Sequence, residues 1–246
     1  MINECFVVGL IRTNCHLVAC DRTLEAMVID PGISTKKELD PILDAIKSRK
    51  LELRYIVNTH HHSDHTSGNG ALKQATSAEI LIHELDAPVL PEPWTWWSRM
   101  VAADPDHPCP ACGMAGAYVE TLKEQGKAVV GCRSCGFKFE VFASPPADRL
   151  LRDGDEVQVG MLDFRVIHTP GHSPGGICLY LEDEKLLFSG DTLFSGSIGR
   201  TDTIDGSFDT IIESVRKLLE LPEDTVVFPG HLEQTTIGQE KRSLAN

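Results

Sequence analysis

A run of seven residues that begins at position 59 reads Thr-His-His-His-Ser-Asp-His. Imidazole and carboxylate groups are ligands for divalent metals such as Zn²⁺. A solvated polar loop is the simpler interpretation, since isolated histidines are usually structural or surface residues. In an extended loop, residues two apart point the same way, so we expect His60, His62 and Asp64 to face one centre. His65 would begin to reach a second centre, and His61 would point away.

Three further candidate ligands each follow a separate strand-like segment. His172 ends Thr-Pro-Gly-His, Asp191 ends Phe-Ser-Gly-Asp, and His231 ends Phe-Pro-Gly-His. Glycine precedes the ligand in every case, which lets the backbone turn sharply where a strand ends. Ligands delivered from several strand ends favour a shared metal site over an accidental polar run.

Two CxxC pairs form a second group of candidate ligands. Cys109-Pro-Ala-Cys112 and Cys132-Arg-Ser-Cys135 are separated by nineteen residues, and each is followed by glycine. Two knuckles of this spacing resemble a zinc ribbon, in which four thiolates hold one Zn²⁺. Rubredoxin-like iron and a redox CxxC pair are alternatives. The matched pairs favour a closed structural site, because a segment of about forty residues needs a clip when it cannot build its own core.

The remaining cysteines and the N-terminus indicate the compartment. Cys5, Cys15, Cys20 and Cys178 lie singly in apolar surroundings, and we expect buried thiols there. The N-terminus lacks the basic start and apolar stretch of a signal peptide, and no apolar run approaches the ~18 residues of a membrane helix. We therefore expect a cytoplasmic protein with reduced thiols and no membrane partner.

Composition describes an ordinary globular chain with an acidic balance. Of the 246 residues, 41% are hydrophobic and 24% are charged, which is typical of a protein with a sizeable core. Lys plus Arg number 23 against 36 for Asp plus Glu, so the formal net charge is 23 − 36 = −13. Because this charge would repel a phosphate backbone, we expect no nucleic-acid partner.

Short strand-like and helix-like segments alternate in both halves of the chain. A helix is expected over 35–50, where apolar residues recur at helical spacing after Thr35-x-x-Glu38, a capping box. A second helix with one apolar stripe is expected near 207–220. Strands are expected at 5–11, 16–20, 26–30, 55–58, near 157, and at 164–168, 177–181, 185–189 and 226–228.

The segment between the two halves differs in composition and is interpreted as an insertion. We divide the chain into a first half over 1–98, a zinc-ribbon-like insertion over 99–145 and a second half over 146–246. All three tryptophans stand just before the insertion. We hypothesise that Trp94, Trp96 and Trp97 line or cover the metal pocket; the alternative is that they only dock the ribbon.

The order of the candidate ligands resembles the signature of the metallo-β-lactamase superfamily: an H-x-H-x-D-H run, then Gly-His, Gly-Asp and a final Gly-His. The resemblance implies an α/β fold, a four-layer αβ/βα sandwich with the metals at one edge. It would place one metal on His60, His62 and His172. It would place a second on Asp64, His65 and His231, with Asp191 bridging the two. Histidine at position 62, where a di-iron flavoprotein branch has glutamate, resembles the hydrolytic branch.

The stretch 189–202, together with 229–231 and 235–240, is similar to a short glyoxalase II-like (hydroxyacylglutathione hydrolase-like) group. This resemblance implies a binuclear metallohydrolase that cleaves a small-molecule thioester through a metal-bridging hydroxide, with Asp64 and Asp191 as catalytic residues. The two active-site metals would be Zn²⁺, with iron or manganese as alternatives. The chain ends fifteen residues after His231. Full-length glyoxalase II continues into a helical region that grips glutathione, so glutathione recognition is left open.

Two other functions are considered. A persulfide dioxygenase would use a single iron on His60, His172 and Asp191, and the number of bound metals separates it from a dinuclear hydrolase. A non-catalytic binding or scaffold protein would act through the ribbon insertion and turn over no substrate. A homo-oligomer is left open. Structural hydrogen-bonding roles are expected for the remaining polar candidates, which are His16, His83, His107, His168 and Arg200.

Overall fold

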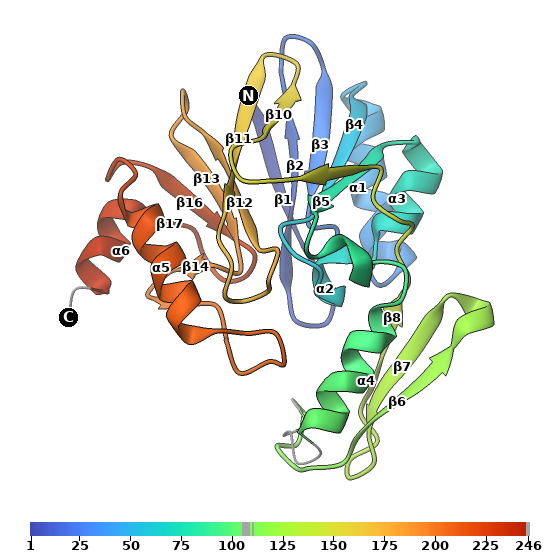
Figure 1. Cartoon of the computed structure of the whole chain (residues 1–246). Coiled ribbons are helices and arrows are strands. Elements are labelled where there is room, and N and C mark those ends of the chain that lie inside the picture. The colour runs from blue at the N-terminus through green and yellow to red at the C-terminus, as the bar shows by residue number, and fades with distance from the viewer. Residues whose placement is uncertain (105–108, 110, 245–246) are drawn as a thin grey trace.

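Two six-stranded sheets pack face to face, with helices on their outer surfaces (Figure 1). The structure, a computed structural model, describes residues 1–104, 109 and 111–244; His107 therefore lies outside the described residues. In the first sheet β3, β4, β5 and β9 are parallel, and β1 and β2 are antiparallel. Its strand order is β1 (Ile2–Val8), β2 (Thr13–Ala19), β3 (Glu25–Ile29), β4 (Glu52–Val57), β5 (Glu79–His83) and β9 (Arg149–Leu151).

The second sheet is also mixed, because β13 and β16 pair in parallel within an otherwise antiparallel order. A short hairpin of β14 (Leu193–Phe194) and β15 (Ser197–Ile198) follows β13. The strand order of the sheet is β10 (Glu156–Val159), β11 (Leu162–His168), β12 (Ile177–Leu181), β13 (Leu186–Gly190), β16 (Val226–Pro229) and β17 (Thr235–Thr236).

Helices cover the outer face of each sheet, which completes four layers. On the first sheet lie α1 (Lys36–Ser48) and α3 (Asn69–Thr76), and on the second lie α5 (Phe208–Leu219) and α6 (Ile237–Ser243). The predicted αβ/βα sandwich is confirmed. None of the described helices has the length and apolar character needed to cross a bilayer.

Local sequence explains the two long covering helices. Thr35 and Glu38 form the predicted capping box of α1, and Ile42 and Ile46 are buried on its inner face. Ser207 caps α5 by accepting a hydrogen bond from the Thr210 N–H. The apolar stripe of each helix packs on its sheet, so both helices form where the periodicity predicts.

The central core lies between the two sheets. Alternate side chains of β11 point inward, and Phe164 and Val166 are buried there with Met27 and Val57 of the opposite sheet. Phe188 extends the same cluster. This shared core fixes how the two sheets lie on each other, and therefore how the loops at their edges meet.

The structure differs from the sequence-based expectation near the N-terminus. The first strand runs from Ile2 to Val8 rather than over 5–11, because Gly9 and Arg12 adopt left-handed backbone conformations in the turn. The expectation of a buried Cys5 is wrong. Cys5 is exposed since β1 is an edge strand, whereas the other three single cysteines, Cys15, Cys20 and Cys178, are buried.

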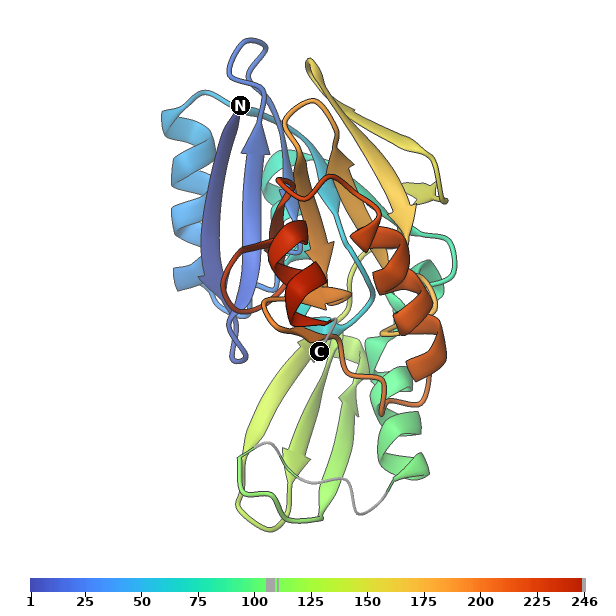
Figure 2. The ribbon, with the colours of Figure 1, turned by 90° about the vertical axis from the view of Figure 1, so that its left-hand side faces the viewer.

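The insertion is a small unit that projects from the sandwich (Figures 1 and 2). It comprises α4 (Pro93–Ala103) and a three-stranded antiparallel sheet of β6 (Ala117–Leu122), β7 (Lys127–Cys132) and β8 (Lys138–Phe142). The predicted boundary between 98 and 99 falls inside α4. Among the described residues, none between 91 and 146 belongs to the three main core clusters. Short segments α2 (Ser63–Thr66), η1 (Ala87–Val89) and η2 (Lys123–Gln125) complete the fold.

Replacement of Phe164 by alanine should lower the free energy of unfolding by about 3–5 kcal/mol, because it leaves a cavity between the sheets. Phe208→Ala is the matched control, since Phe208 is 62% exposed and its loss should cost less than about 0.5 kcal/mol. Urea denaturation measures both values. Equal losses in the two variants would contradict the four-layer packing.

Candidate metal centre

The histidine-rich run follows β4 and turns directly into a helix. His62 has an extended backbone and precedes α2, so Asp64 and His65 project from a helical turn. The expected extended loop is therefore wrong beyond residue 62. The helix places His65 underneath His60, with ring centroids 4.1 Å apart. Because of this turn, the run supplies His60 and His62 to one group of candidate ligands and Asp64 and His65 to a neighbouring group.

A first group of ligands consists of His60, His62 and His172. Their ring centroids lie 4.5–4.8 Å apart, so three imidazoles from two halves of the chain surround one point. The Nε2 atoms of all three are buried, and none has a hydrogen-bond partner among the described residues. Burial of an unpaired polar atom is costly, so three such atoms directed at one another fit a cation-binding site.

A second group consists of Asp64, His65 and His231. Asp64 Oδ2 lies 3.1 Å from His65 Nε2 and 3.2 Å from His231 Nε2. The two imidazole Nε2 atoms are 3.2 Å apart. The three ligand atoms therefore lie close enough to share one ion.

Asp191 lies between the two groups. Its Oδ2 atom is 3.5 Å from the Nε2 atoms of both His172 and His231, and its Oδ1 atom is 3.5 Å from His65 Nε2. One carboxylate thus contacts both groups, which is the division that the resemblance implies. All seven predicted ligands come together here; their role as ligands stays a prediction.

The electrostatics of the first group suit a cation. Burial lowers the pKa of the His60 imidazole well below its usual value, and the neighbouring histidines lower it further. Burial likewise lowers the pKa of His62. Both rings are therefore neutral near pH 7 and keep a free lone pair, which is the form that binds a metal. Together with two carboxylates, this donor set fits two divalent cations.

The glycine before each late ligand has a definite role. Gly171 and Gly190 have φ values of +127° and +50°, which favour glycine. Gly230 is needed for space instead: a Cβ there would lie 2.3 Å from Asp191 Oδ1 and 2.7 Å from His65 Cε1. A side chain at position 230 would fill the volume between the ligands.

Sequence reasoning missed Asp30, a buried carboxylate at the end of β3. Its oxygens accept hydrogen bonds from the Thr59 N–H at 2.7 Å and the Thr59 hydroxyl at 2.6 Å. Asp30 Oδ2 also lies 3.0 Å from Nδ1 of His65, so it orients that ring with Nε2 toward the second group. Asp30 stands alone in the sequence, so no spacing pattern identifies it.

Asp86, just after β5, joins the two halves of the centre and was also missed. Its carboxylate accepts hydrogen bonds from the His61 N–H at 3.1 Å, the Ser173 hydroxyl at 2.7 Å and the Gly175 N–H at 2.6 Å. It is fully buried. One carboxylate therefore fixes the loop that carries His60 relative to the loop that carries His172.

His61 lies outside both ligand groups, as expected. Its Nε2 atom is 3.0 Å from Asp205 Oδ2. His172 is held through Nδ1, which lies 2.8 Å from the Arg200 carbonyl oxygen. The Arg200 side chain pairs with Asp202, and its structural role stays a prediction.

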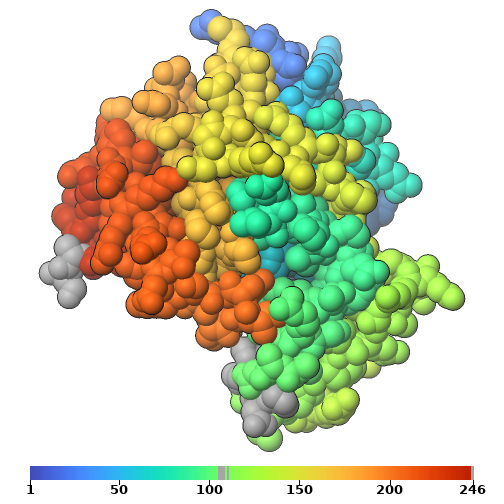
Figure 3. Space-filling model, viewed as in Figure 1, coloured from blue at the N-terminus to red at the C-terminus, as the bar shows by residue number. Residues whose placement is uncertain are grey.

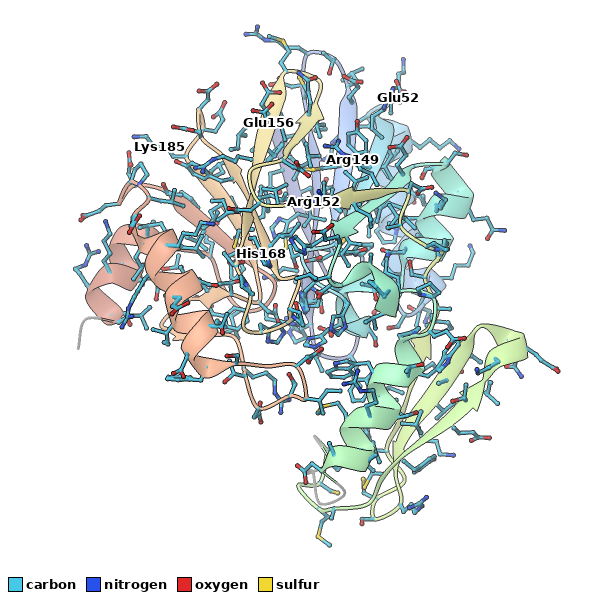
Figure 4. All side chains as sticks on the ribbon, in the orientation of Figure 1. Glu52, Arg149, Arg152, Glu156, His168 and Lys185 are labelled. Atoms are coloured by element: carbon cyan, nitrogen blue, oxygen red, sulfur yellow. The ribbon has the colours of Figure 1, made fainter. Side chains whose placement is uncertain are left out.

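The other described histidines have structural contacts. His16 Nδ1 lies 3.1 Å from Asn3 Oδ1 across the first two strands. His168, labelled in Figure 4 at the end of β11, stacks on His83 with ring centroids 4.1 Å apart. His168 Nε2 donates to the Pro174 carbonyl at 2.9 Å, which steadies the turn after His172.

All three tryptophans lie on α4, and Trp96 and Trp97 contact the metal-binding loop. The Trp96 ring packs on His62 at a centroid distance of 4.8 Å. Trp97 donates from Nε1 to Ser63 Oγ at 2.9 Å and packs on Phe139 of β8. These contacts place the residues beside the centre and also dock the ribbon; an effect on substrate entry stays a prediction.

The four ribbon cysteines come together at a separate site. Their sulfur atoms all lie within 4.8 Å of one another, and all four thiols are free. Cys109 and Cys112 precede β6, Cys132 ends β7, and Cys135 lies in the turn that follows. The two CxxC pairs are therefore close enough to share one ion, as the spacing predicts.

Gly230→Ala should reduce the metal bound at the histidine and aspartate ligands at least tenfold, because the new methyl group occupies space beside Asp191 and His65. Gly70→Ala is the control, since Gly70 lies in α3 where a Cβ meets only ordinary contacts. Metal per chain after dialysis measures the effect. Unchanged metal content in Gly230→Ala would show that the ligands do not enclose a cation.

Asp86→Ala should lower the free energy of unfolding by about 3–5 kcal/mol, because it leaves three donors in the interior without an acceptor. Asp183→Ala removes an exposed carboxylate from a turn and should change stability by less than about 0.5 kcal/mol. Urea denaturation of both variants tests this, and a near-neutral Asp86→Ala would contradict the proposed link between the halves.

Comparison with known sequences agrees with this geometry. Residues 8–231 match the family described as the metallo-beta-lactamase superfamily. The hydroxyacylglutathione hydrolase GloC of Haemophilus influenzae is 32% identical over 98% of this chain and 95% of its own length. A hydroxyacylglutathione hydrolase of Rhodospirillum rubrum is 32% identical over 88% of this chain and 60% of its own length.

Solved structures show the same architecture. BLEG-1 B3 metallo-beta-lactamase aligns with a TM-score of 0.74 at 29% identity, covering 98% of this chain and 97% of its own. TTHA1623 in a di-iron-bound form aligns at 0.71 with 28% identity and 98% coverage of each chain. ETHE1 from Myxococcus xanthus aligns at 0.68 with 25% identity, covering 99% of this chain and 83% of its own. The matching signature, fold and ligand arrangement show that this chain belongs to the metallo-beta-lactamase superfamily.

Proposed function

We propose that the protein is a dinuclear metallohydrolase that cleaves a thioester of the hydroxyacylglutathione type. The observation that carries the proposal is the convergence of two three-residue ligand groups on one shared carboxylate, Asp191. The similarity to two hydroxyacylglutathione hydrolases at 32% identity supports the substrate class. Zn²⁺ is the proposed metal, with iron or manganese as alternatives that suit the same ligands.

The residues that would hold the metals also set the charge of the site. When bound, two divalent cations lower the pKa of water and polarise a carbonyl. Asp64 and Asp191 neutralise two of the four positive charges that such a pair brings. With both metals bound, the site would keep a net positive charge, which would stabilise an oxyanion at a thioester carbonyl.

The leaving group explains why few further side chains are required. A thiolate with a pKa near roughly 9 departs without strong help from a general acid. The ligands themselves are held from outside: Asp30 lies beside His65, and the Arg200 carbonyl lies beside His172. These contacts orient the rings before substrate arrives, which reduces the reorganisation needed during reaction.

A single-iron persulfide dioxygenase is the competing function. It would use His60, His172 and Asp191 alone. The second group would then have no ligand role, although its three ligand atoms lie 3.1–3.2 Å apart around a buried His65. This arrangement favours two metals.

Asp191→Ala should abolish thioester cleavage and lower the metal bound at the centre, because it removes the carboxylate that contacts both ligand groups. Asp163→Ala, an exposed change on β11, is the control and should retain full activity. The assays are hydrolysis of a panel of thioesters and metal per chain in protein purified without added metal.

Oxygen uptake with a persulfide substrate, measured on the same preparations, separates the competing function. We expect thioester cleavage without oxygen uptake. A fully active Asp191→Ala protein, or oxygen uptake with one iron and no thioester cleavage, would contradict the proposal. An absence of turnover on every substrate would favour a binding or scaffold role.

A further inference from the structure

The sulfur positions of the cysteine cluster (Cys109, Cys112, Cys132 and Cys135) match a tetrahedral metal site. Cys109 Sγ lies 3.8 Å from Cys135 Sγ, and Cys112 Sγ lies 3.9 Å from Cys132 Sγ. Four thiolates about 2.3 Å from one central ion stand at the corners of a tetrahedron with edges of about 3.8 Å. A disulfide would require a separation of about 2.05 Å.

The backbone around the cysteines has the form of two matched knuckles. The N–H of Gly113 donates to the Cys109 carbonyl at 2.7 Å, and the N–H of Gly136 donates to the Cys132 carbonyl at 2.9 Å. Both glycines have φ values near the left-handed region, +70° and +75°. The same turn occurs in both CxxC pairs, so each pair can direct its two thiols at one shared centre.

Helix α4 connects the cysteine cluster to the catalytic centre. It begins at the sandwich and runs toward the end of the insertion where the cysteine-bearing loops lie (Figures 1 and 2). Trp97, in the middle of α4, packs on Phe139 of the ribbon sheet at 5.2 Å and donates to Ser63 of α2 at 2.9 Å. One side chain therefore contacts both the ribbon and the element that carries Asp64.

Trp96 makes a second connection, to the first ligand group and to a loop in the second half of the chain. Its ring packs on His62, and its Nε1 donates to Asp205 Oδ2 at 2.9 Å. The same oxygen lies 3.0 Å from His61 Nε2. The N–H of Ile204 also contacts Met100 Sδ of α4 at 3.3 Å. In the space-filling view the green helix meets the orange segment near residue 200 (Figure 3).

The three-stranded sheet of the ribbon has few buried side chains of its own. Within the described part of the insertion, the buried side chains of the three strands are Ala128, Val130, Cys132 and Val141. So few apolar groups contribute only a few kcal/mol, which is less than the conformational entropy lost by ordering the segment. A metal at the cysteines would supply the missing stabilisation and so fix the ribbon sheet against α4.

We propose that the cysteine cluster binds one divalent metal, Zn²⁺ or Fe²⁺, and that this metal holds α4 against the catalytic loops. Trp96 and Trp97 are then positioning residues, acting on the metal centre through His62 and Ser63. Loss of the ribbon metal loosens α4, and the catalytic ligands lose part of their support. The insertion thus acts as a clamp: a metal bound at the cysteines raises the affinity of the histidine and aspartate centre for its own metals.

Cys112→Ser tests the cysteine site, because Cys112 is exposed and its replacement disturbs little packing. Cys5→Ser, an exposed cysteine on β1, is the matched control. With Co²⁺ as the probe metal, wild type and Cys5→Ser should show intense thiolate-to-cobalt absorption, and Cys112→Ser should lose it. An unchanged cobalt spectrum in Cys112→Ser would overturn the assignment of the site.

The coupling is tested by the affinity of the histidine and aspartate centre for Zn²⁺, measured by competition with a chelator on folded protein. Cys112→Ser should weaken this affinity about tenfold, the usual effect of losing an outer support of a metal ligand. Circular dichroism must show that the variant is folded at the temperature used. A folded Cys112→Ser protein with wild-type affinity would overturn the coupling.

Trp96→Phe removes the hydrogen bond to Asp205 and reduces the ring that packs on His62, and it gives a second test that leaves the ribbon cysteines unchanged. Trp94→Phe is its matched control on the same helix, since Trp94 Nε1 is buried without a partner among the described residues. We expect about tenfold weaker Zn²⁺ binding at the centre for Trp96→Phe and no change for Trp94→Phe. Equal affinities in the two variants would contradict the positioning role.

Only the catalytic readout rests on the proposed thioester hydrolysis. The ratio kcat/KM of Cys112→Ser and Trp96→Phe should fall with their Zn²⁺ affinity and recover when Zn²⁺ is in excess. If neither the wild type nor any variant cleaves thioesters, the proposed function is rejected. The cobalt spectrum and the Zn²⁺ affinities of the histidine and aspartate centre still test the clamp. A variant that binds Zn²⁺ weakly and whose kcat/KM does not recover in excess Zn²⁺ would contradict the clamp.

Discussion

The metal centre depends on ligand atoms that are held close together. Without a cation, these atoms repel one another or lack hydrogen-bond partners. The buried Nε2 atoms of three imidazoles face one point, and Asp191 contacts the same group through His172. Such a group is costly to bury alone, so the surrounding structure has to enforce it. Two carboxylates do much of this: Asp30 fixes Thr59 and contacts His65, and Asp86 joins the two ligand loops.

Strand direction explains why these groups meet. Asp30, the histidine run and Asp86 follow the carboxyl ends of β3, β4 and β5, which are parallel neighbours. Asp191 and His231 follow β13 and β16, the parallel pair of the second sheet. The inter-sheet core around Phe164 holds these two edges side by side. A site at the carboxyl ends of parallel strands therefore results from packing that lies mostly far from the ligands.

The sequence predicts which seven side chains converge, because each belongs to a short motif whose glycine or neighbouring histidine marks it. It predicts α1 and α5 for the same reason, since caps and apolar periodicity are local signals. Asp30, Asp86 and Asp205 lack such signals, because their partners lie 25 to 144 residues away. The helical turn of α2 was missed because alternation in a seven-residue run does not distinguish a loop from a single turn. Trp94, Trp96 and Trp97 lie in α4, which has proline at its first position, where a missing N–H costs little.

On this account the insertion supports the centre, since α4 contacts the ligand His62, its neighbour Ser63 and Asp205 in the second half of the chain. A crystal structure with anomalous diffraction at the metal absorption edge tests the central claim most directly. We predict one peak among His60, His62 and His172, and a second among Asp64, His65 and His231, with Asp191 in contact with both. A single peak bound only by His60, His172 and Asp191, with nothing at the second group, would contradict the dinuclear centre.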